Sequence, residues 1–138
     1  MLRTEIIHPD LLAALARAGH GAQVLIADGN YPHSTGVPAT AERIHLNLAP
    51  GMLTVSQVLT PLAATVPIEF AEIMLTSEGE EAPIVAEYRA LLPGVPFAGC
   101  ERFEFYDRAR TSDVAVVIAT GEQRQYANLL LTIGVRTP

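Results

Sequence analysis

Histidine titrates near neutral pH and aspartate accepts hydrogen bonds, and this chain holds such a pair close together in sequence. His20 stands between two glycines just after a predicted helix, and Asp28 follows at the end of an apolar run. An imidazole with a pKa near 6.5 can act as a general acid or base, and a carboxylate accepts several hydrogen bonds. The plainer interpretations are that His20 only ends a helix and that Asp28 only forms a turn. At this point each of the two is a separate candidate.

A second set of candidates lies in the last third of the chain and consists of hydrogen-bonding side chains. Arg102 and Tyr106 stand on either side of two phenylalanines, and Tyr126 and Asn128 follow a predicted loop. A guanidinium, two hydroxyls and an amide can together bind a polyhydroxy ligand through hydrogen bonds. The alternative for Arg102 is a solvated strand face.

Residue types that bind metals or common cofactors are scarce. The spacing of His20, His33 and His45 matches no metal-ligand pattern, and a single cysteine, Cys100, excludes an internal disulfide and multi-cysteine metal sites. All nine cations are arginines, which excludes Schiff-base chemistry and any phosphate loop that needs its lysine. We therefore expect neither a metal nor a cofactor.

The composition narrows the class of protein further. The chain has 138 residues, a net charge of −6 and no basic run, which argues against nucleic-acid binding. We find no charged leader and no apolar run of about 18 residues, so we expect a cytoplasmic protein with neither signal peptide nor membrane span. Only 17% of the residues are charged and 49% are hydrophobic. Such a chain must cover apolar surface, and we expect it to self-associate.

Hydrophobic periodicity and turn formers predict the elements that must position these residues. Helices are expected over 9–18, 54–64 and 81–92, with a helical turn over 106–109, and strands over 23–27, 43–48, 67–75, 101–105, 114–120 and 128–133. This alternation predicts a layered α/β fold with a largely parallel sheet, in a single domain over 1–138. Ligands of such sheets bind beyond the carboxyl ends of the strands, where we expect three polar loops, 28–36, 102–108 and 121–128.

Several short motifs occur in one order along the chain. They are Gly19-His20-Gly21, then Asp28, the stretch Glu101-Arg102-Phe103-Glu104-Phe105-Tyr106-Asp107-Arg108-Ala109, and Thr120-Gly121-Glu122 leading to Tyr126-Ala127-Asn128. From about residue 4 to the C-terminus the chain resembles the RbsD/FucU family of sugar mutarotases. The resemblance implies an RbsD-like three-layer α/β/α domain with a largely parallel, mixed sheet.

The resemblance also implies roles for individual residues. His20 matches the proton-donating histidine of the family and Asp28 its substrate-binding aspartate. The sugar-binding triplet matches Tyr126, Ala127 and Asn128.

The two branches of the family differ in the residues that they carry near Arg102. Arg102 and Tyr106 fall on a segment that contributes site residues in the fucose branch, whereas the ribose branch carries a histidine near Arg102. We therefore expect Tyr106 to act with His20 and Asp28 in catalysis and Arg102 to bind substrate.

The chain also departs from the family pattern. An aspartate often stands two residues after the histidine, where this chain has Ala22, and residues 43–51, with His45 in place of an expected aspartate, are more like the ribose branch.

The implied function is an isomerase that interconverts the anomers of a free monosaccharide, with L-fucose expected first. The alternatives are a D-ribose pyranase, which interconverts pyranose and furanose, and a non-catalytic module that binds a monosaccharide. The resemblance further implies a homo-oligomer, commonly a decamer of two stacked pentamers, with the site at a junction between neighbouring chains. In it, the loop carrying His20 and Asp28 and the loop carrying Tyr126 and Asn128 need not come from the same copy.

Overall fold

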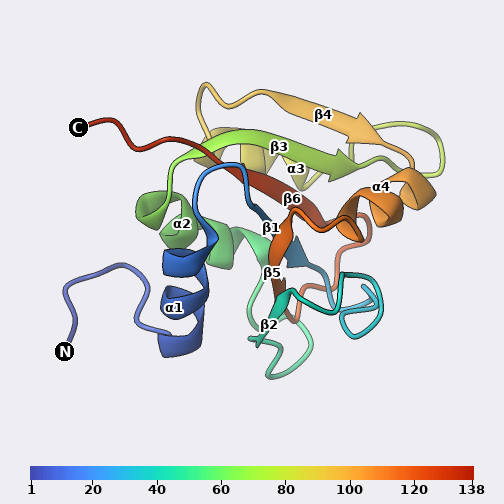
Figure 1. The fold of residues 1–138 in the computed structure, drawn as a ribbon. Coiled ribbons are helices and arrows are strands. Elements are labelled where there is room, and N and C mark those ends of the chain that lie inside the picture. Colours follow the sequence, from blue (N-terminus) through green and yellow to red (C-terminus); the bar gives the residue numbers. More distant parts are fainter.

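The computed structural model describes all 138 residues and arranges them around one six-stranded sheet (Figure 1). The strand order is β2-β5-β1-β6-β3-β4, where β1 is Gln23–Ala27, β2 Glu42–His45, β3 Ile68–Met74, β4 Phe97–Cys100, β5 Val114–Ala119 and β6 Leu129–Ile133. Only β6 runs against the others, since it pairs antiparallel with both β1 and β3 while the remaining pairings are parallel. The expectation of a largely parallel, mixed sheet is confirmed.

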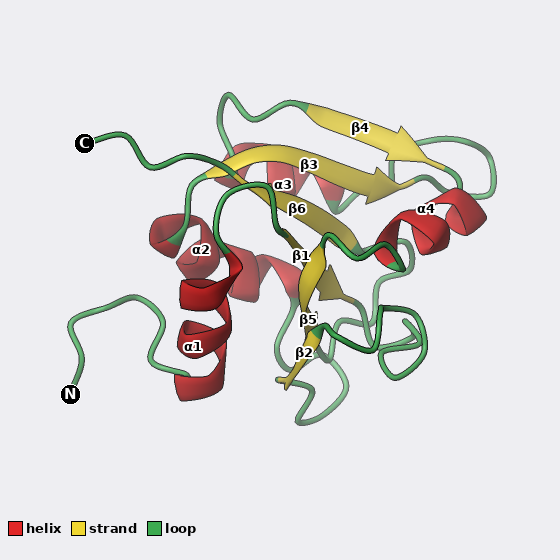
Figure 2. Ribbon diagram, in the orientation of Figure 1, coloured by secondary structure: helices red, strands yellow, loops and turns green.

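Helices cover both faces of this sheet, which confirms the three-layer α/β/α arrangement (Figure 2). The larger core joins one face to α1 (Pro9–Ala18), α2 (Val55–Thr65) and α3 (Val85–Leu91). The smaller core joins the other face to α4 (Arg102–Ala109) and to the loop after β1. Side chains alternate along β1 accordingly: Val24 and Ile26 enter the larger core, and Leu25 and Ala27 the smaller one.

Local sequence signals explain where the first two helices begin. Pro9 occupies the first turn of α1, and the His8 side chain accepts a hydrogen bond from Leu11 N. Thr54 and Gln57 form the expected capping box at the start of α2. Pro61 lies within α2 without ending it, and the helix continues to Thr65. None of the four helices is long and apolar enough to cross a membrane.

The expectation of a strand over 101–105 followed by a helical turn is wrong, because Arg102–Ala109 is one helix, α4. The alternation of charged and aromatic residues misleads, because Phe103 is exposed while Phe105 and Ala109, four residues apart, are buried. The Glu101 carboxylate begins the helix by accepting hydrogen bonds from Phe103 N and Glu104 N. Burial at helical spacing and this cap favour the helix.

The strand preceding α4 was not expected from the sequence. β4 is a four-residue edge strand, Phe97–Cys100, that pairs only with β3. It is short and contains Gly99, so it carries little alternating pattern. α3 is also shorter than the expected 81–92, and β2 stops at His45 rather than at residue 48.

Candidate functional site

A polar cleft of about 350 Å³ opens at the carboxyl ends of the parallel strands, between the loops 28–36 and 121–128 and residues 102–108, which form part of helix α4 rather than the expected loop. In Figure 1 the arrows of β3 and β4 point towards this end of the molecule, where α4 lies. The residues that line the cleft are Asp28, Asn30, Tyr31, Met74, Arg102, Tyr106, Gln125, Tyr126 and Asn128. The structure thus brings together all the candidate side chains named from the sequence except His20 and Ala127.

Asp28 and Asn128 form the buried floor of this cleft. Asp28 N–H donates to Asn128 Oδ1 at 2.9 Å, and Asn128 Nδ2 donates to Asp28 Oδ2 at 3.0 Å. The second carboxylate oxygen accepts from Asn30 N at 3.0 Å. Burial raises the pKa of the Asp28 carboxyl, although hydrogen bonds from backbone N–H groups partly oppose the rise. A carboxylate held in this way presents a fixed acceptor to a ligand.

Helix α4 carries the two candidates that face Asp28 across the cleft. Arg102 and Tyr106 are four residues apart and therefore share one face of the helix. The Tyr106 ring packs edge-on against Tyr31, with centroids 5.5 Å apart, and the Arg102 guanidinium lies 4.7 Å from the centre of the Phe103 ring. An ion pair between Arg108 and the buried Glu72 fixes α4 to β3. The helix therefore presents one cation and one hydroxyl in defined positions.

Tyr126 has the only left-handed backbone among the non-glycine residues, with φ of 58°. Such a conformation costs roughly 1 kcal/mol for a residue with a side chain, and backbone strain of this kind occurs at functional sites. Ala127, next to it, is fully buried and lies outside the cleft lining; its carbonyl accepts a hydrogen bond of 2.6 Å from Tyr88 Oη. Ala127 thus anchors the turn that holds Tyr126 and Asn128.

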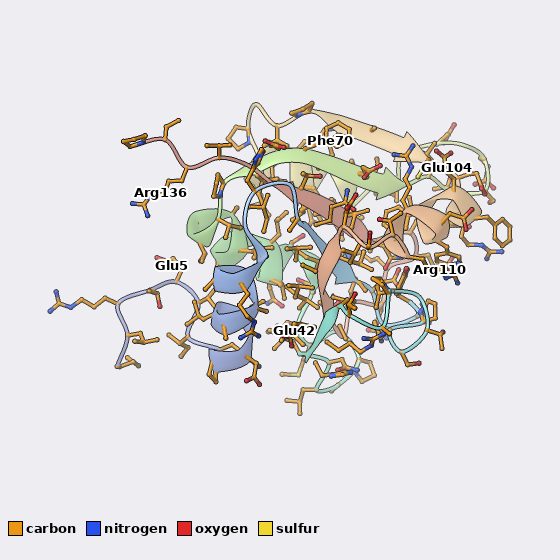
Figure 3. All side chains as sticks on the ribbon, viewed as in Figure 1. Glu5, Glu42, Phe70, Glu104, Arg110 and Arg136 are labelled. Carbon is orange, nitrogen blue, oxygen red and sulfur yellow. The ribbon has the colours of Figure 1, made fainter.

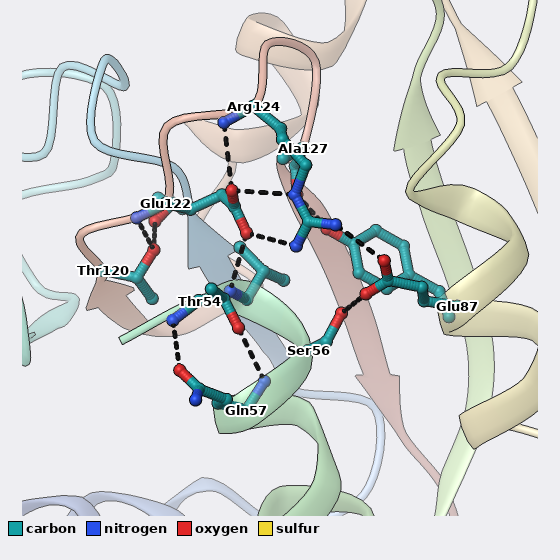
Figure 4. A network of polar contacts seen from close by, with 11 residues as sticks. Thr54, Ser56, Gln57, Glu87, Thr120, Glu122, Arg124 and Ala127 are labelled. Carbon is teal, nitrogen blue, oxygen red and sulfur yellow. Dashed lines mark hydrogen bonds and ion pairs between the residues drawn. The ribbon is translucent and has the colours of Figure 1, made fainter. Parts of the chain in front are cut away.

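A polar network around the buried Glu122 supports the same loop (Figure 4). The Glu122 carboxylate accepts from Arg124 Nε at 3.0 Å, from Arg124 Nη2 at 2.8 Å and from Val55 N at 3.3 Å, at the start of α2. Burial alone would raise the pKa of Glu122, but the hydrogen bonds from Arg124 outweigh it and the pKa is lowered. Arg124 also reaches Glu87 of α3 at 2.6 Å. The motif Thr120-Gly121-Glu122 therefore has a structural role beside the cleft.

His20 and Asp28 lie at opposite ends of the central strand β1. His20 precedes β1 and Asp28 follows it, so the five residues of that strand separate the two side chains by roughly 17 Å. The His20 side chain is 57% exposed, and its Nε2 lies 3.2 Å from Glu69 Oε2. It borders a hollow that includes Arg136, and Figure 3 shows Arg136 and Glu104 of α4 at opposite ends of the sheet. Within one chain, His20 cannot reach the cleft.

His33 and His45 also lie outside the cleft lining. His33 Nε2–H donates to the carbonyl of Asp28 at 2.9 Å, and burial lowers the pKa of this imidazole. His45 is exposed at the end of β2. No group of three or more histidine, cysteine, aspartate or glutamate side chains is arranged to hold a metal ion.

Sequence reasoning missed four residues of the cleft: Asn30, Tyr31, Met74 and Gln125. Asn30 and Tyr31 immediately follow Asp28, so their position after a buried strand was an available signal. Met74 gives no such signal, because a buried methionine at a strand end resembles any other core residue.

Polar side chains from three connections, gathered around one cleft at the carboxyl edge of an α/β sheet, define a protein that binds a small polar molecule. The model of the RbsD / FucU transport protein family matches residues 1–136, and the chain belongs to this family.

Relatives of both branches resemble the chain over most of its length. The fucose mutarotase of Homo sapiens is 36% identical over 143 residues, which cover 94% of this chain and 90% of the relative. The D-ribose pyranase of Paracidovorax citrulli is 31% identical over 135 residues, 98% of either chain.

Solved structures agree with the fold. Bacillus subtilis RbsD complexed with D-ribose superposes with a TM-score of 0.86 at 26% identity, covering 99% of this chain and 100% of that one. The fucose mutarotase from Streptococcus pneumoniae in complex with L-fucose gives 0.84 at 25% identity, with the same coverage. The family inferred from the motifs is thereby confirmed.

Proposed function

We propose that this chain is a sugar mutarotase, an isomerase that interconverts the anomers of free L-fucose. The observation that carries the proposal is the cleft in which Asp28, Arg102, Tyr106, Tyr126 and Asn128 converge. Its volume of about 350 Å³ is near the lower end of the range of roughly 300–1,000 Å³ for small-molecule sites, which suits a single sugar ring.

The side chains supply the contacts that ring opening needs. A proton leaves the anomeric hydroxyl, a proton reaches the ring oxygen, and the bond between that oxygen and the anomeric carbon breaks to give the aldehyde. Rotation about the adjacent carbon–carbon bond and reclosure then produce the other anomer, with no net gain or loss of protons. Asp28 accepts hydrogen bonds from sugar hydroxyls, while Arg102, Tyr106 and Asn128 donate to sugar oxygens.

His20 takes part as the acid–base group of a neighbouring copy. Its exposed side chain at the amino edge can enter the cleft of another copy, although it cannot enter its own. The site then lies at a junction between chains, as expected, but its residues are divided differently. Asp28, Tyr126 and Asn128 come from one copy, and His20 comes from the next copy rather than from the copy that carries Asp28. The decamer and the cytoplasmic location stay predictions.

Two observations favour L-fucose over D-ribose. Arg102 and Tyr106 line the cleft from α4, on the segment that matches the fucose branch. Identity to the human fucose mutarotase is 36%, against 31% to the pyranase of Paracidovorax citrulli. The alternative is a D-ribose pyranase, since the complex of RbsD with D-ribose has the same fold.

Saturation-transfer NMR on equilibrated L-fucose and D-ribose tests the proposal directly. The protein should accelerate exchange between the fucose anomers more than pyranose–furanose exchange of ribose, and His20→Ala should slow that exchange by roughly 10²–10⁴, as expected for one acid–base group. His45→Ala is the matched control, because that histidine is exposed and lies outside the cleft. It should leave exchange unchanged.

The same measurement separates the alternatives. Faster exchange of ribose would make the chain a pyranase. Saturation transfer to bound fucose without faster anomer exchange would make it a non-catalytic monosaccharide-binding module. A folded His20→Ala protein with an unchanged rate would remove His20 from the mechanism.

A further inference from the structure

The residues next to His20 in the sequence do not fix the orientation of its imidazole ring. Gly19 and Gly21 both have positive φ, 77° and 81°, and neither carries a side chain that could pack against the imidazole. Ala22 packs against the larger core and offers no polar atom. A general acid–base group must be held to within a few tenths of an ångström, so a partner from elsewhere in the fold has to orient this ring.

Glu69 at the start of β3 makes that contact. Its Oε2 lies 3.2 Å from His20 Nε2, and it is the one side chain that hydrogen-bonds the imidazole. An ionised carboxylate only accepts hydrogen bonds, so the proton of the ring lies on Nε2. In the neutral imidazole, Nδ1 is then left free to accept a proton.

Two features of the local fold direct Glu69 towards His20. Ile68 pairs with Ile133 and Phe70 with Thr132, so Glu69 is the extra residue of a β-bulge. Bulges of this kind re-aim a side chain and are frequent beside active sites.

The second feature is Gly134, directly after β6. A Cβ at this position would lie 3.1 Å from Glu69 Cβ and 3.5 Å from Oε2, so the missing side chain leaves the room that the carboxylate occupies. Bulge and glycine together place an exposed carboxylate beside an exposed histidine at the amino edge.

We propose that Glu69 is the positioning residue of His20: it fixes the Nε2–H form of the ring and turns Nδ1 towards the sugar bound by a neighbouring copy. The inference rests on the proposed role of His20 as the acid–base group. Glu69 touches no substrate and acts only through the imidazole.

Kinetics of anomer exchange on the assembled protein test this role with two substitutions. Glu69→Ala should lower kcat about tenfold and leave KM nearly unchanged, as is typical for the loss of an orienting carboxylate. Glu69→Gln should lose less, because its amide oxygen still accepts from Nε2–H. Glu42→Gln removes an equally exposed carboxylate that pairs with Arg17 instead, and should retain full activity.

A double-mutant cycle separates positioning from an independent effect. In the His20→Ala protein, Glu69→Ala should cause no further loss, because the ring that it orients is absent. A further tenfold loss in that background would overturn the inference, and so would a wild-type kcat for Glu69→Ala.

Nitrogen-15 NMR of the histidine rings gives a readout that does not depend on activity. Neutral His20 should show the Nε2–H form in the wild type and a mixture of both forms in Glu69→Ala, while His45 stays unchanged in both proteins. If His20→Ala keeps the full rate, the proposed function loses its acid–base group, and this spectrum alone decides the positioning role. Identical His20 signals in the two proteins would then overturn it.

Discussion

At the scale of single residues, Asp28 combines a proposed binding role with a cost to stability. Its carboxylate is almost fully buried and accepts two hydrogen bonds, from Asn30 N and from Asn128 Nδ2. Burial nevertheless raises its pKa, so the folded protein disfavours the charged form that a sugar hydroxyl would meet. Function and stability therefore oppose each other at this position.

This opposition predicts a pH-dependent stability difference between the wild type and Asp28→Asn. The pKa of Asp28 is higher in the folded protein than in the unfolded chain, where it has the ordinary carboxyl value of about 3.9. At a pH above about 3.9, unfolding therefore releases a proton, and the contribution of Asp28 to stability falls as the pH rises through the folded pKa. The free energy of unfolding of the wild type, relative to the variant, should thus fall between pH 4 and pH 7. Urea titrations at both pH values measure it.

The variant should also lose anomer exchange by about 10², because the amide replaces one of the two carboxylate acceptors with a donor. Asp113→Asn, at an exposed carboxyl before β5, is the control for charge alone. A stability difference that is the same at both pH values would contradict the assigned effect of burial.

Single residues also show what the sequence could and could not reveal about the site. Asp28, Tyr126 and Asn128 were predictable because they lie at strand ends, and strand ends on one edge of a sheet converge. His20 was predicted to act with Asp28 because both match residues of the family pattern, where they stand eight positions apart. Residues that flank a strand lie at its two ends, so this proximity in sequence becomes separation in space.

At the scale of elements, α4 is where local sequence and structure disagree most. Its alternating charged and aromatic residues resemble a strand, and only the Glu101 cap and the helical spacing of Phe105 and Ala109 indicate otherwise. β4 could not be predicted, because a four-residue edge strand carries too little pattern to distinguish it from a loop. By contrast, α1 matched its expected range, since a proline start and a glycine stop define it.

The cap of α4 should matter for substrate binding as well as for stability. Glu101→Ala removes the acceptor for Phe103 N and Glu104 N, which costs about 1 kcal/mol. It also loosens the turn that carries Arg102, so KM for L-fucose should rise several-fold. His8→Ala, the matched control, removes the cap of α1 far from the cleft. Thermal unfolding and exchange kinetics should show a stability loss in both variants but a KM change only in Glu101→Ala.

An unchanged KM for Glu101→Ala, with the stability loss present, would mean that α4 holds Arg102 without its cap. The ion pair of Arg108 with Glu72 would then be the contact that positions the helix.

At the scale of the whole molecule, the proposed site at a junction between copies predicts complementation between inactive variants. His20→Ala keeps an intact cleft and Asp28→Asn keeps an intact histidine. After subunit exchange in an equal mixture, about a quarter of the junctions in a closed ring combine both intact halves. Exchange activity should therefore recover to about a quarter of the wild-type value, while light scattering of the wild type should give several times the chain mass of 14.8 kDa.

A stable monomer with full activity would contradict this arrangement, and so would a mixture that stays inactive after subunit exchange has been demonstrated with labelled chains. If either variant alone showed the same activity as the mixture, complementation would be excluded as the cause.

Strand β6 runs antiparallel to its neighbours and connects the two ends of the sheet at which the proposed half-sites lie. Asn128 directly precedes this strand at the cleft and Gly134 directly follows it beside Glu69, so in the proposed assembly one strand links the half-site that receives His20 to the half-site that donates it. Copies joined in this way associate head to tail. An open row then always has one complete site fewer than it has copies, and only closure makes the two numbers equal. Loss of a single copy from a ring would therefore silence two junctions at once.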